Sequence, residues 1–275
     1  MTLAKRAFTA LSDRLHPSLL APIGSVLLSV RRRDRCTVRY ADGDWIHRYR
    51  GGIVVGPALG GPTAGWQDRD TWDAFLYGYR PGRGDTVLDI GAGVGGEVRV
   101  LSRLVGSTGR VVSVEAHPRI YRCLRRTVEL NRLDNVTTMH CAVTGAPGSV
   151  FIENDTEHHL GNGLTTDAAA GIAVTGRTLA DIVDELGIVH IDLLKMNIEG
   201  AELSVLDAAR EVLPAVRNLV VSCHDFVAGP DPDDGRRTFD RVRRLLERAG
   251  YTIRTREHDP RPWIRCYVYA SRQTS

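Results

Sequence analysis

One segment constrains the fold of this chain more than any other: the apolar run Val87-Leu88-Asp89-Ile90 leads directly into the glycine turn Gly91-Ala92-Gly93. Residues 95–105, which follow, have the pattern of a helix. A buried strand, a tight glycine turn and a helix form the first unit of Rossmann-like α/β folds, in which a nucleoside-containing ligand lies against the turn. The segment therefore predicts an α/β domain with a ligand site at this turn.

The chain after Asp85 continues to alternate strand and helix patterns, which is typical of a parallel sheet with helices on both faces. We expect seven strands, at residues 86–90, 110–115, 136–143, 191–197, 218–223, 251–254 and 263–269. Helices are expected at residues 95–105, 118–131, 179–186, 201–209 and 238–249. Residues 255–262 are too few for a helical crossover, so the last two strands should pair antiparallel. The predicted fold class is α/β, with a seven-stranded, mostly parallel sheet and an antiparallel last strand.

The first 84 residues are predicted to form an accessory segment, and residues 85–275 the ligand-binding domain. Residues 35–40 and 45–49 flank an Asp-Gly turn and predict a β-hairpin, whereas residues 51–65 predict a loop and residues 72–79 a short helix. The 12-residue apolar run at 19–30 is shorter than the roughly 20 residues of a membrane-spanning helix. We expect this N-terminal extension, a helix and a hairpin, to cover the substrate cleft or to contact another subunit of a homo-oligomer.

Composition narrows the classes of partner and compartment. The net charge of +3 is too mild to imply nucleic-acid binding by itself, because a nucleic-acid binder usually presents a concentrated basic face. The five cysteines stand singly, without a CxxC pair, which argues against a secreted disulfide scaffold and against a zinc ribbon. These features favour a cytoplasmic protein that acts on a small molecule and not on nucleic acid.

Gly91, Gly93 and Gly96 also satisfy the GxGxxG pattern of dinucleotide-binding sites, so the glycines alone do not identify the ligand. The charges beside them do. Asp89 at the end of the strand and Glu97 at the start of the helix would repel a pyrophosphate on the turn. S-adenosylmethionine (SAM) has no phosphate there, and its ammonium group can bind a strand-end carboxylate such as Asp89 directly or through water. The sequence therefore favours SAM over NAD or a flavin dinucleotide.

Two later strands complete the predicted cofactor site. Glu115 ends the second strand, where a carboxylate binds ribose hydroxyls in Rossmann-like sites. After the third strand, Cys141-Ala142-Val143-Thr144 offers no acid for the adenine amino group, so backbone groups and apolar packing should recognise the base. We predict that the cofactor is bound by Asp89, Gly91, Gly93, Glu115, Ala142 and Asn197.

The reacting groups are expected beyond the carboxyl ends of the fourth and fifth strands, because open α/β sheets place their chemistry there. His224 and Asp225 follow the fifth strand, and Glu199 follows the fourth. A hydroxyl is a poor nucleophile at neutral pH, and His224, with an ordinary pKa of about 6.5, is the candidate base. Asp225 or Glu199 could orient its ring. The alternative is a histidine that makes only a structural hydrogen bond.

The run Leu194-Lys195-Met196-Asn197-Ile198-Glu199-Gly200-Ala201-Glu202 carries a resemblance to a known family. Together with the glycine turn and Glu115-Ala116-His117-Pro118, it resembles the FkbM family of SAM-dependent methyltransferases over roughly residues 85–225. The resemblance implies a class I Rossmann-like methyltransferase fold with SAM as the cofactor. It also implies O-methylation of a hydroxyl on a small molecule, a sugar, glycoside or polyketide-type compound of natural product biosynthesis.

The chain departs from the family at Asn197, where the family usually has an aspartate. An amide keeps its hydrogen bonds but has no charge, which puts a role as a base or strong metal ligand in doubt. A divalent cation held by Asn197, His224 and Asp225 is an alternative that we do not favour, because a single carboxylate binds a hard cation weakly. Two other functions stay open: a SAM- or dinucleotide-binding protein without methyl transfer, and an RNA ribose 2′-O-methyltransferase.

Overall fold

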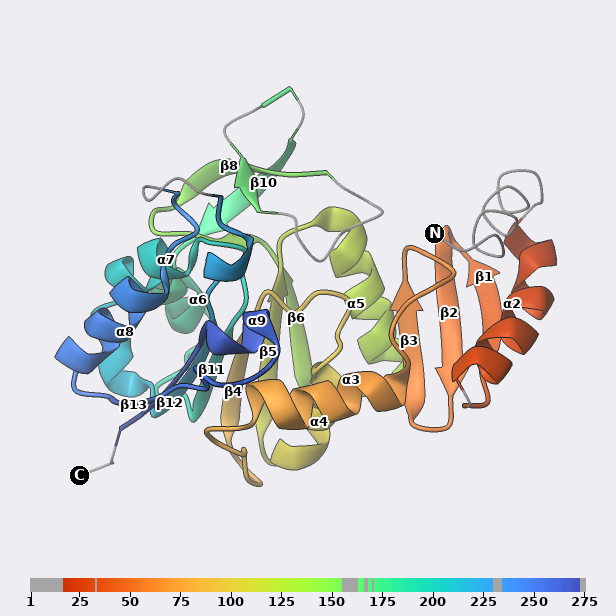
Figure 1. Cartoon of the computed structure of the whole chain (residues 1–275), viewed down its shortest axis with the longest axis horizontal. Helices are drawn as coiled ribbons and strands as arrows, with labels where there is room; N and C mark the ends of the chain where they lie inside the picture. Colours follow the sequence, from red (N-terminus) through yellow and green to blue (C-terminus); the bar gives the residue numbers. More distant parts are fainter. Residues whose placement is uncertain are drawn as a thin grey trace.

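The computed structural model describes residues 17–32, 34–154, 163–165, 168–169, 171–229 and 234–272. A seven-stranded sheet of order β13-β14-β12-β11-β4-β5-β6 lies at the centre (Figure 1). The strands are β4 (Thr86–Ile90), β5 (Arg110–Glu115), β6 (Val136–His140), β11 (Leu193–Met196), β12 (Asn218–Ser222), β13 (Thr252–Arg254) and β14 (Tyr267–Ser271). The strands from β6 to β12 pair parallel, whereas β14 pairs antiparallel with both β12 and β13. The predicted α/β class and the antiparallel last strand are therefore confirmed.

Helices cover both faces of this sheet, which explains why its central strands are mostly apolar. Val87 and Leu88 are neighbours in β4 and point to opposite faces, so they belong to different core clusters. One face packs on α4 (Val98–Val105) and α5 (Pro118–Asn131). The other packs on α6 (Leu179–Glu185), α7 (Glu202–Ala208) and α8 (Phe239–Arg248).

The strand predicted at residues 136–143 is wrong in its second half. β6 ends at His140, and after Cys141 the two residues of β7 (Ala142–Val143) leave the central sheet. They join a second sheet of order β7-β10-β8-β9, which lies above the carboxyl ends of the central strands (Figure 1). Its other strands are β8 (Gly148–Ile152), β9 (Leu164–Thr165) and β10 (Ile172–Arg177). These strands are short and partly exposed, so they lack the continuous apolar run that identified the central strands.

The N-terminal residues form α2 (Pro17–Arg32) and an antiparallel sheet of β1 (Thr37–Ala41), β2 (Asp44–Tyr49) and β3 (Gly52–Gly56). The predicted hairpin is confirmed as β1 and β2. The loop predicted at residues 51–65 is wrong at both ends, because residues 52–56 form β3 and Ala64 begins α3 (Ala64–Asp70), whereas residues 57–63 are irregular as predicted. Among the helices that the structure describes, none is long and apolar enough to cross a membrane.

Two further boundaries differ from the prediction. The helix expected at residues 72–79 is a π-helical turn, Thr71–Phe75, that continues directly from α3. The strand expected from residue 263 begins only at Tyr267, because α9 (Pro262–Arg265) forms a helical turn before it. The proline at the start of α9 suits the first turn of a helix, where its missing N–H leaves no backbone acceptor unsatisfied.

A buried carboxylate fixes the N-terminal sheet to the main domain. Asp44, at the start of β2, is fully buried and accepts hydrogen bonds from two arginines of α5. Arg122 Nη2 lies 2.6 Å from Asp44 Oδ1, and Arg126 Nη1 lies 2.9 Å from Asp44 Oδ2. Asn131, at the end of α5, adds hydrogen bonds to the backbone N–H and C=O of Ile53.

We expect Asp44→Ala to lower the free energy of unfolding by about 3 kcal/mol, because the two arginines lose a buried counter-charge and its hydrogen bonds. Urea denaturation followed by circular dichroism measures this loss. Asp42→Asn is the matched control: Asp42 also pairs with Arg126 but is 84% exposed, and an amide tolerates the φ of +54° at this position, so the loss should be less than about 1 kcal/mol. Equal losses in the two variants would show that Asp44 does not anchor the sheet.

Candidate active site

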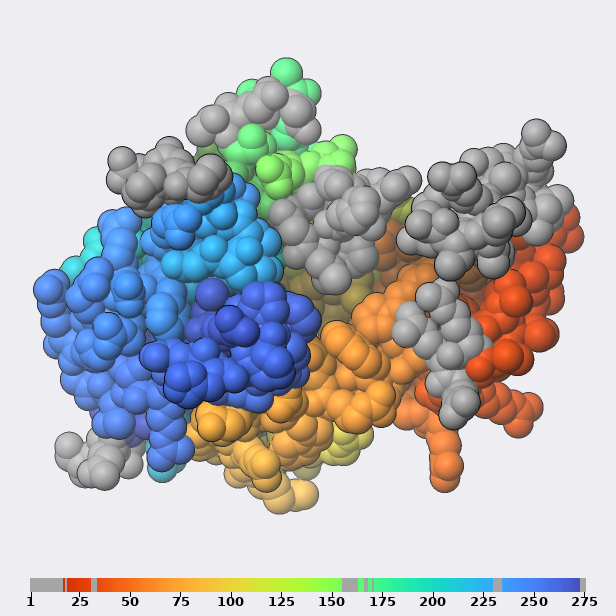
Figure 2. Space-filling model, in the orientation of Figure 1, coloured from red at the N-terminus to blue at the C-terminus, as the bar shows by residue number. Residues whose placement is uncertain are grey.

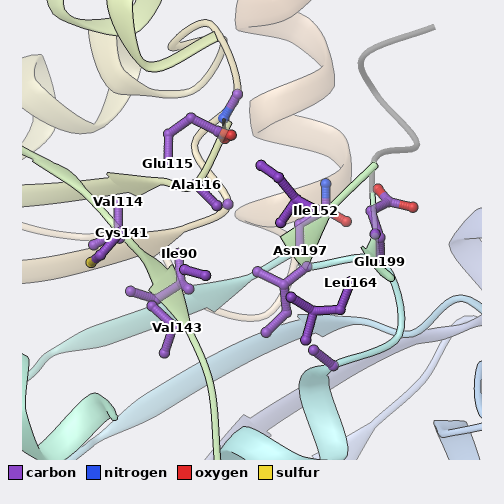
Figure 3. Close-up of a pocket in the computed structure, with 16 residues that line it drawn as sticks. Ile90, Val114, Glu115, Ala116, Cys141, Val143, Ile152, Leu164, Asn197 and Glu199 are labelled. Atoms are coloured by element: carbon purple, nitrogen blue, oxygen red, sulfur yellow. Dashed lines mark hydrogen bonds between the residues drawn. The ribbon is translucent and has the colours of Figure 1, made fainter. Parts of the chain in front are cut away.

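A pocket lies at the carboxyl ends of β4, β5 and β11, between the central sheet and the second sheet (Figure 3). In Figure 3, Glu115 and Glu199 project from opposite sides of this pocket, and Asn197 lies between them. Of the residues predicted from the sequence, those that line it are Gly91, Gly93, Glu115, Ala142, Asn197 and Glu199. None of the described residues before β4 lines the pocket, so the structure does not support the expectation that the N-terminal segment covers the cleft.

The glycine turn is the floor of the pocket, and its first residue has to be glycine. The backbone N–H groups of Gly91 and Ala92 donate to the carbonyl oxygen of Val114, which ties the turn to β5. Gly91 has a φ of +76°, and a Cβ at this position would lie 1.9 Å from the carbonyl oxygen of Asn197. The close approach of these two chains therefore requires glycine, both for its conformation and for its missing side chain.

Glu115 connects the turn to the wall of the pocket. One of its carboxylate oxygens accepts a hydrogen bond from Gly93 N at 2.9 Å, and the other accepts one from His117 N at 2.8 Å. Burial raises the pKa of Glu115, although these backbone donors oppose the change. Each carboxylate oxygen has a second lone pair, so the fixed side chain can still accept hydrogen bonds from two hydroxyl groups of a ligand.

Asp89 supports the turn from the interior and does not line the pocket. It is fully buried, and its Oδ1 lies 2.9 Å from Nζ of Lys195. Lys195 Nζ also donates to the carbonyl oxygen of Gly91 at 2.7 Å and lies over the ring of Phe75. Burial alone would lower the pKa of Lys195, but the neighbouring carboxylates of Asp89 and Glu97 outweigh it and raise the pKa. The direct contact that we predicted between Asp89 and the cofactor is therefore replaced by an ion pair under the turn.

Glu97 is the residue before α4 and belongs to the same buried group of charges. Burial raises the pKa of Glu97 to about 7, while the ammonium of Lys195 opposes the change and the carboxylate of Asp89 adds to it. Glu97 is thus only partly ionised at neutral pH. Its repulsion of a pyrophosphate is weaker than the sequence argument assumed, and the Lys195 ammonium offsets that of Asp89, so these two charges alone do not distinguish SAM from a dinucleotide.

Glu199 is held at the pocket by His224 and Glu202. Glu199 itself has a φ of +53°, a left-handed conformation that needs support from its neighbours. His224 Nε2 lies 3.2 Å from Glu199 Oε2, and His224 Nδ1 lies 2.8 Å from Glu202 Oε1. The same Glu202 oxygen accepts hydrogen bonds from the backbone N–H groups of Ile198 and Gly200, on either side of Glu199. Hydrogen bonds to Glu202 and His224 therefore fix the loop that carries Glu199.

The two carboxylates change the chemistry expected of His224. Burial alone would lower its pKa, but the hydrogen bonds and charges of Glu199 and Glu202 outweigh burial and raise the pKa to about 9. His224 is therefore an imidazolium at neutral pH and is buried away from the pocket. Glu199 lines the pocket, and His224 does not.

Asp225 does not have the orienting position that the sequence suggested. Its Oδ2 accepts hydrogen bonds from Thr238 N and Phe239 N at 3.0 Å and so caps the start of α8. Glu202 makes the contact with His224 that we expected of Asp225. Both ring nitrogens of His224 face carboxylates, so the proposed set of Asn197, His224 and Asp225 does not converge on one point. Among the described residues, no group of three or more His, Cys, Asp or Glu side chains could hold a metal ion.

Lys195 and Glu202 support the residues that line the pocket, and the sequence analysis did not identify them. Both lie within the run that carried the family resemblance, but neither was given a role. The signal for Lys195 was present: a lysine inside the fully buried strand β11 has to find a counter-charge. Glu202 gives no such signal, because an acid in the first turn of a helix is common on an exposed surface.

Among known proteins, this chain is similar to methyltransferases. The family model described as "Methyltransferase FkbM domain" matches residues 89–253, more than half of the chain. No curated protein matches the chain. A solved structure of an FkbM methyltransferase from Methylobacillus flagellatus is 21% identical to this chain, with a TM-score of 0.46. The match covers 68% of this chain and 43% of the other chain, so this chain matches less than half of that protein's length. Fibrillarin from Aeropyrum pernix, solved with natively bound SAM, is 16% identical with a TM-score of 0.45, over 85% of this chain and 96% of that one.

Proposed function

Since the chain belongs to the FkbM methyltransferase family, we propose that it transfers the methyl group of SAM to a hydroxyl of a small molecule. The acceptor class that we propose is a sugar, a glycoside or a polyketide-type compound. The observation that carries the proposal is the position of Glu199. Its carboxylate lies at the wall of the pocket opposite Glu115, and His224 and Glu202 fix it there (Figure 3).

The residues present fit the adenosyl and ribose parts of SAM. Glu115 keeps free lone pairs for ribose hydroxyls, and a Cβ at Gly93 would meet no protein atom within 4 Å, which leaves room for a ligand beside the turn. The apolar side chains of Val143 and Ile152 and the backbone at Ala142 suit a neutral base. SAM supplies an electrophilic methyl group on a sulfonium centre.

The remaining task of the site is to position a hydroxyl and to remove its proton. An ionised carboxylate within hydrogen-bond reach of the acceptor can do both. It can accept a hydrogen bond but cannot donate one, so it orients the O–H group toward itself. Glu199 is 20% exposed and meets this requirement, whereas His224 is 3% exposed and Glu202 is fully buried. We assign Glu199 as the base and His224 and Glu202 as positioning residues.

Calorimetric titration with SAM, S-adenosylhomocysteine and NAD tests the cofactor. We expect micromolar binding of both adenosyl ligands and none of NAD, because SAM is the cofactor of the methyltransferase family to which the chain belongs. A screen of hydroxylated acceptors with labelled methyl groups then tests transfer. Binding of NAD in place of SAM would overturn the proposal.

We expect Glu199→Gln to lower kcat by about 100-fold or more, because the amide cannot take the hydroxyl proton, while the affinity for SAM changes little. Steady-state kinetics with the acceptor found in the screen, together with SAM titration, measures both. Glu185→Gln is the control: Glu185 is a surface carboxylate that pairs with Arg177 outside the pocket. Undiminished kcat in Glu199→Gln would remove Glu199 from the base role.

A further inference from the structure

The outward face of α2 is apolar along its whole described length. Its exposed side chains are Leu19, Pro22, Ile23, Val26, Leu27 and Val30. Val26 is 65% exposed and Val30 is 75% exposed. Scattered apolar residues are normal on a protein surface, but a continuous patch on one element marks a contact surface.

The sheet holds α2 in this orientation. Ser25 Oγ accepts a hydrogen bond from Val38 N at 2.8 Å, and Ser29 Oγ accepts one from Cys36 N at 2.9 Å. These serines satisfy backbone groups at the outer edge of β1, while Leu20 and Ala21 pack into the N-terminal core. If α2 rotated to bury its apolar face, these hydrogen bonds and this packing would be lost. The apolar face therefore stays on the outside and needs a partner.

The spacing of the exposed residues indicates what the partner is. Leu19, Ile23, Val26 and Val30 follow one another at intervals of four, three and four residues, which is the spacing of the seam between two packed helices. We propose that α2 forms the interface of a homodimer, in which it packs antiparallel against α2 of a second copy of this chain. Figures 1 and 2 show the described part of α2 at one end of the molecule, beyond β1.

Charge determines the direction of pairing. The sequence places Arg31 and Arg32 at the end of α2, directly after the apolar face. Parallel helices would set these cationic positions of the two copies side by side, whereas antiparallel helices separate them by on the order of 20 Å and also oppose the helix dipoles. A helix that binds a lipid surface carries cationic residues along the flanks of its apolar face. Here Ser25 and Ser29 occupy a flank and bond to β1, which favours a protein partner.

Sedimentation of the full chain over about 1 to 100 µM tests the interface. Because a standard interface buries about 800 Å² on each partner, more than one helix offers, we expect a reversible dimer. Val26→Glu brings two carboxylates into the interface and should weaken dimerisation by about 30-fold or more. Val189→Glu is the control, since Val189 is a 91% exposed apolar residue outside the N-terminal segment. A monomeric wild type, or a Val26→Glu variant that dimerises as well as the wild type, would overturn the proposal.

Cysteine trapping tests the geometry. Antiparallel pairing sets residue 23 of one copy opposite residue 26 of the other, so Ile23→Cys and Val26→Cys should form a disulfide efficiently when mixed and poorly when alone. Efficient cross-linking of Val26→Cys with itself would indicate parallel helices and contradict the proposed arrangement.

Flotation with vesicles of phosphatidylglycerol tests whether a lipid surface, and not a second copy, covers the apolar face of α2. Binding of a monomeric chain to these vesicles, abolished by Val26→Glu, would assign the face to a lipid surface and overturn the dimer.

Discussion

Gly91→Ala should abolish SAM binding and lower the free energy of unfolding by at least about 3 kcal/mol. The added Cβ would lie 1.9 Å from the carbonyl oxygen of Asn197 and 2.8 Å from its carbonyl carbon. Asn197 cannot move away freely, because its N–H donates to the carbonyl oxygen of Ile90 at 3.0 Å. Separating the two chains would also displace the Lys195 ammonium, which donates to the carbonyl oxygen of Gly91. The substitution therefore disturbs the pocket floor and the buried ion pair together.

Two other glycines separate the causes of this loss. Gly187, in the loop after α6, has a φ of +59°, and a Cβ added there would meet no atom within 4 Å. Gly187→Ala therefore measures only the cost of a left-handed backbone, about 1 to 2 kcal/mol. Gly93→Ala has the same free space and a φ of +55°, but it lies in the pocket. We expect Gly93→Ala to be as stable as Gly187→Ala and to bind SAM more weakly. Denaturation and calorimetry measure both properties. If Gly91→Ala were no less stable than Gly187→Ala, the close approach at Asn197 would not be important.

Local patterns were sufficient where one segment determines its own structure. The strand, glycine turn and helix around Gly91 need only their own residues, and the short connection at 255–262 required antiparallel pairing of the last strands. The positions of Glu115 and Glu199 followed from the rule that parallel strands bring their carboxyl ends to one edge. These two carboxylates do line the pocket.

Features that depend on distant partners could not be predicted in the same way. The second sheet exists because β7 pairs with β10 and β10 with β8, and each of these strands alone is too short and too exposed to be recognised. Asp89 was expected at the ligand because its partner, Lys195, lies far away along the sequence. The pairing of β4 with β11 places the two residues directly opposite each other, and no local pattern contains that information.

The same limitation applies to the protonation state of His224. A histidine at the end of a strand suggests a base if it is neutral near pH 7, and the sequence offered Asp225 or Glu199 as its single partner. The structure supplies two carboxylates, one on each ring nitrogen, and Glu202 is the one that was not foreseen. The protonation state of His224 therefore depends on a contact between two separate elements, the start of α7 and the end of β12.

Glu202→Gln should lower the pKa of His224 by at least about 1 pH unit and reduce a pH-dependent contribution to stability. The wild-type pKa of about 9 in the folded state lies above the ordinary value of about 6.5 in the unfolded chain. Between these values the folded state holds a proton that the unfolded state has lost, so stability falls as the pH rises. The contribution, about 3 kcal/mol, is complete below about pH 6.5 and is lost as the pH passes about 9. Removing the charge of Glu202 should make the contribution of His224 to stability smaller. This contribution should then be lost at a lower pH than in the wild type.

Denaturation at a series of pH values measures the effect, and His224→Gln is the reference in which this contribution is absent. The reference is needed because Glu97, with its pKa raised to about 7, makes stability fall with pH mainly between about 4.5 and 7. Subtracting the His224→Gln stability curve from the wild-type curve removes the contribution of Glu97.

The pH dependence of wild-type kcat tests the same charge. If His224 stays protonated near pH 6.5, kcat should show no rise at that pH that depends on His224. A rise at that pH, lost in His224→Gln, would return the role of base to His224 and leave Glu199 as the group that orients it.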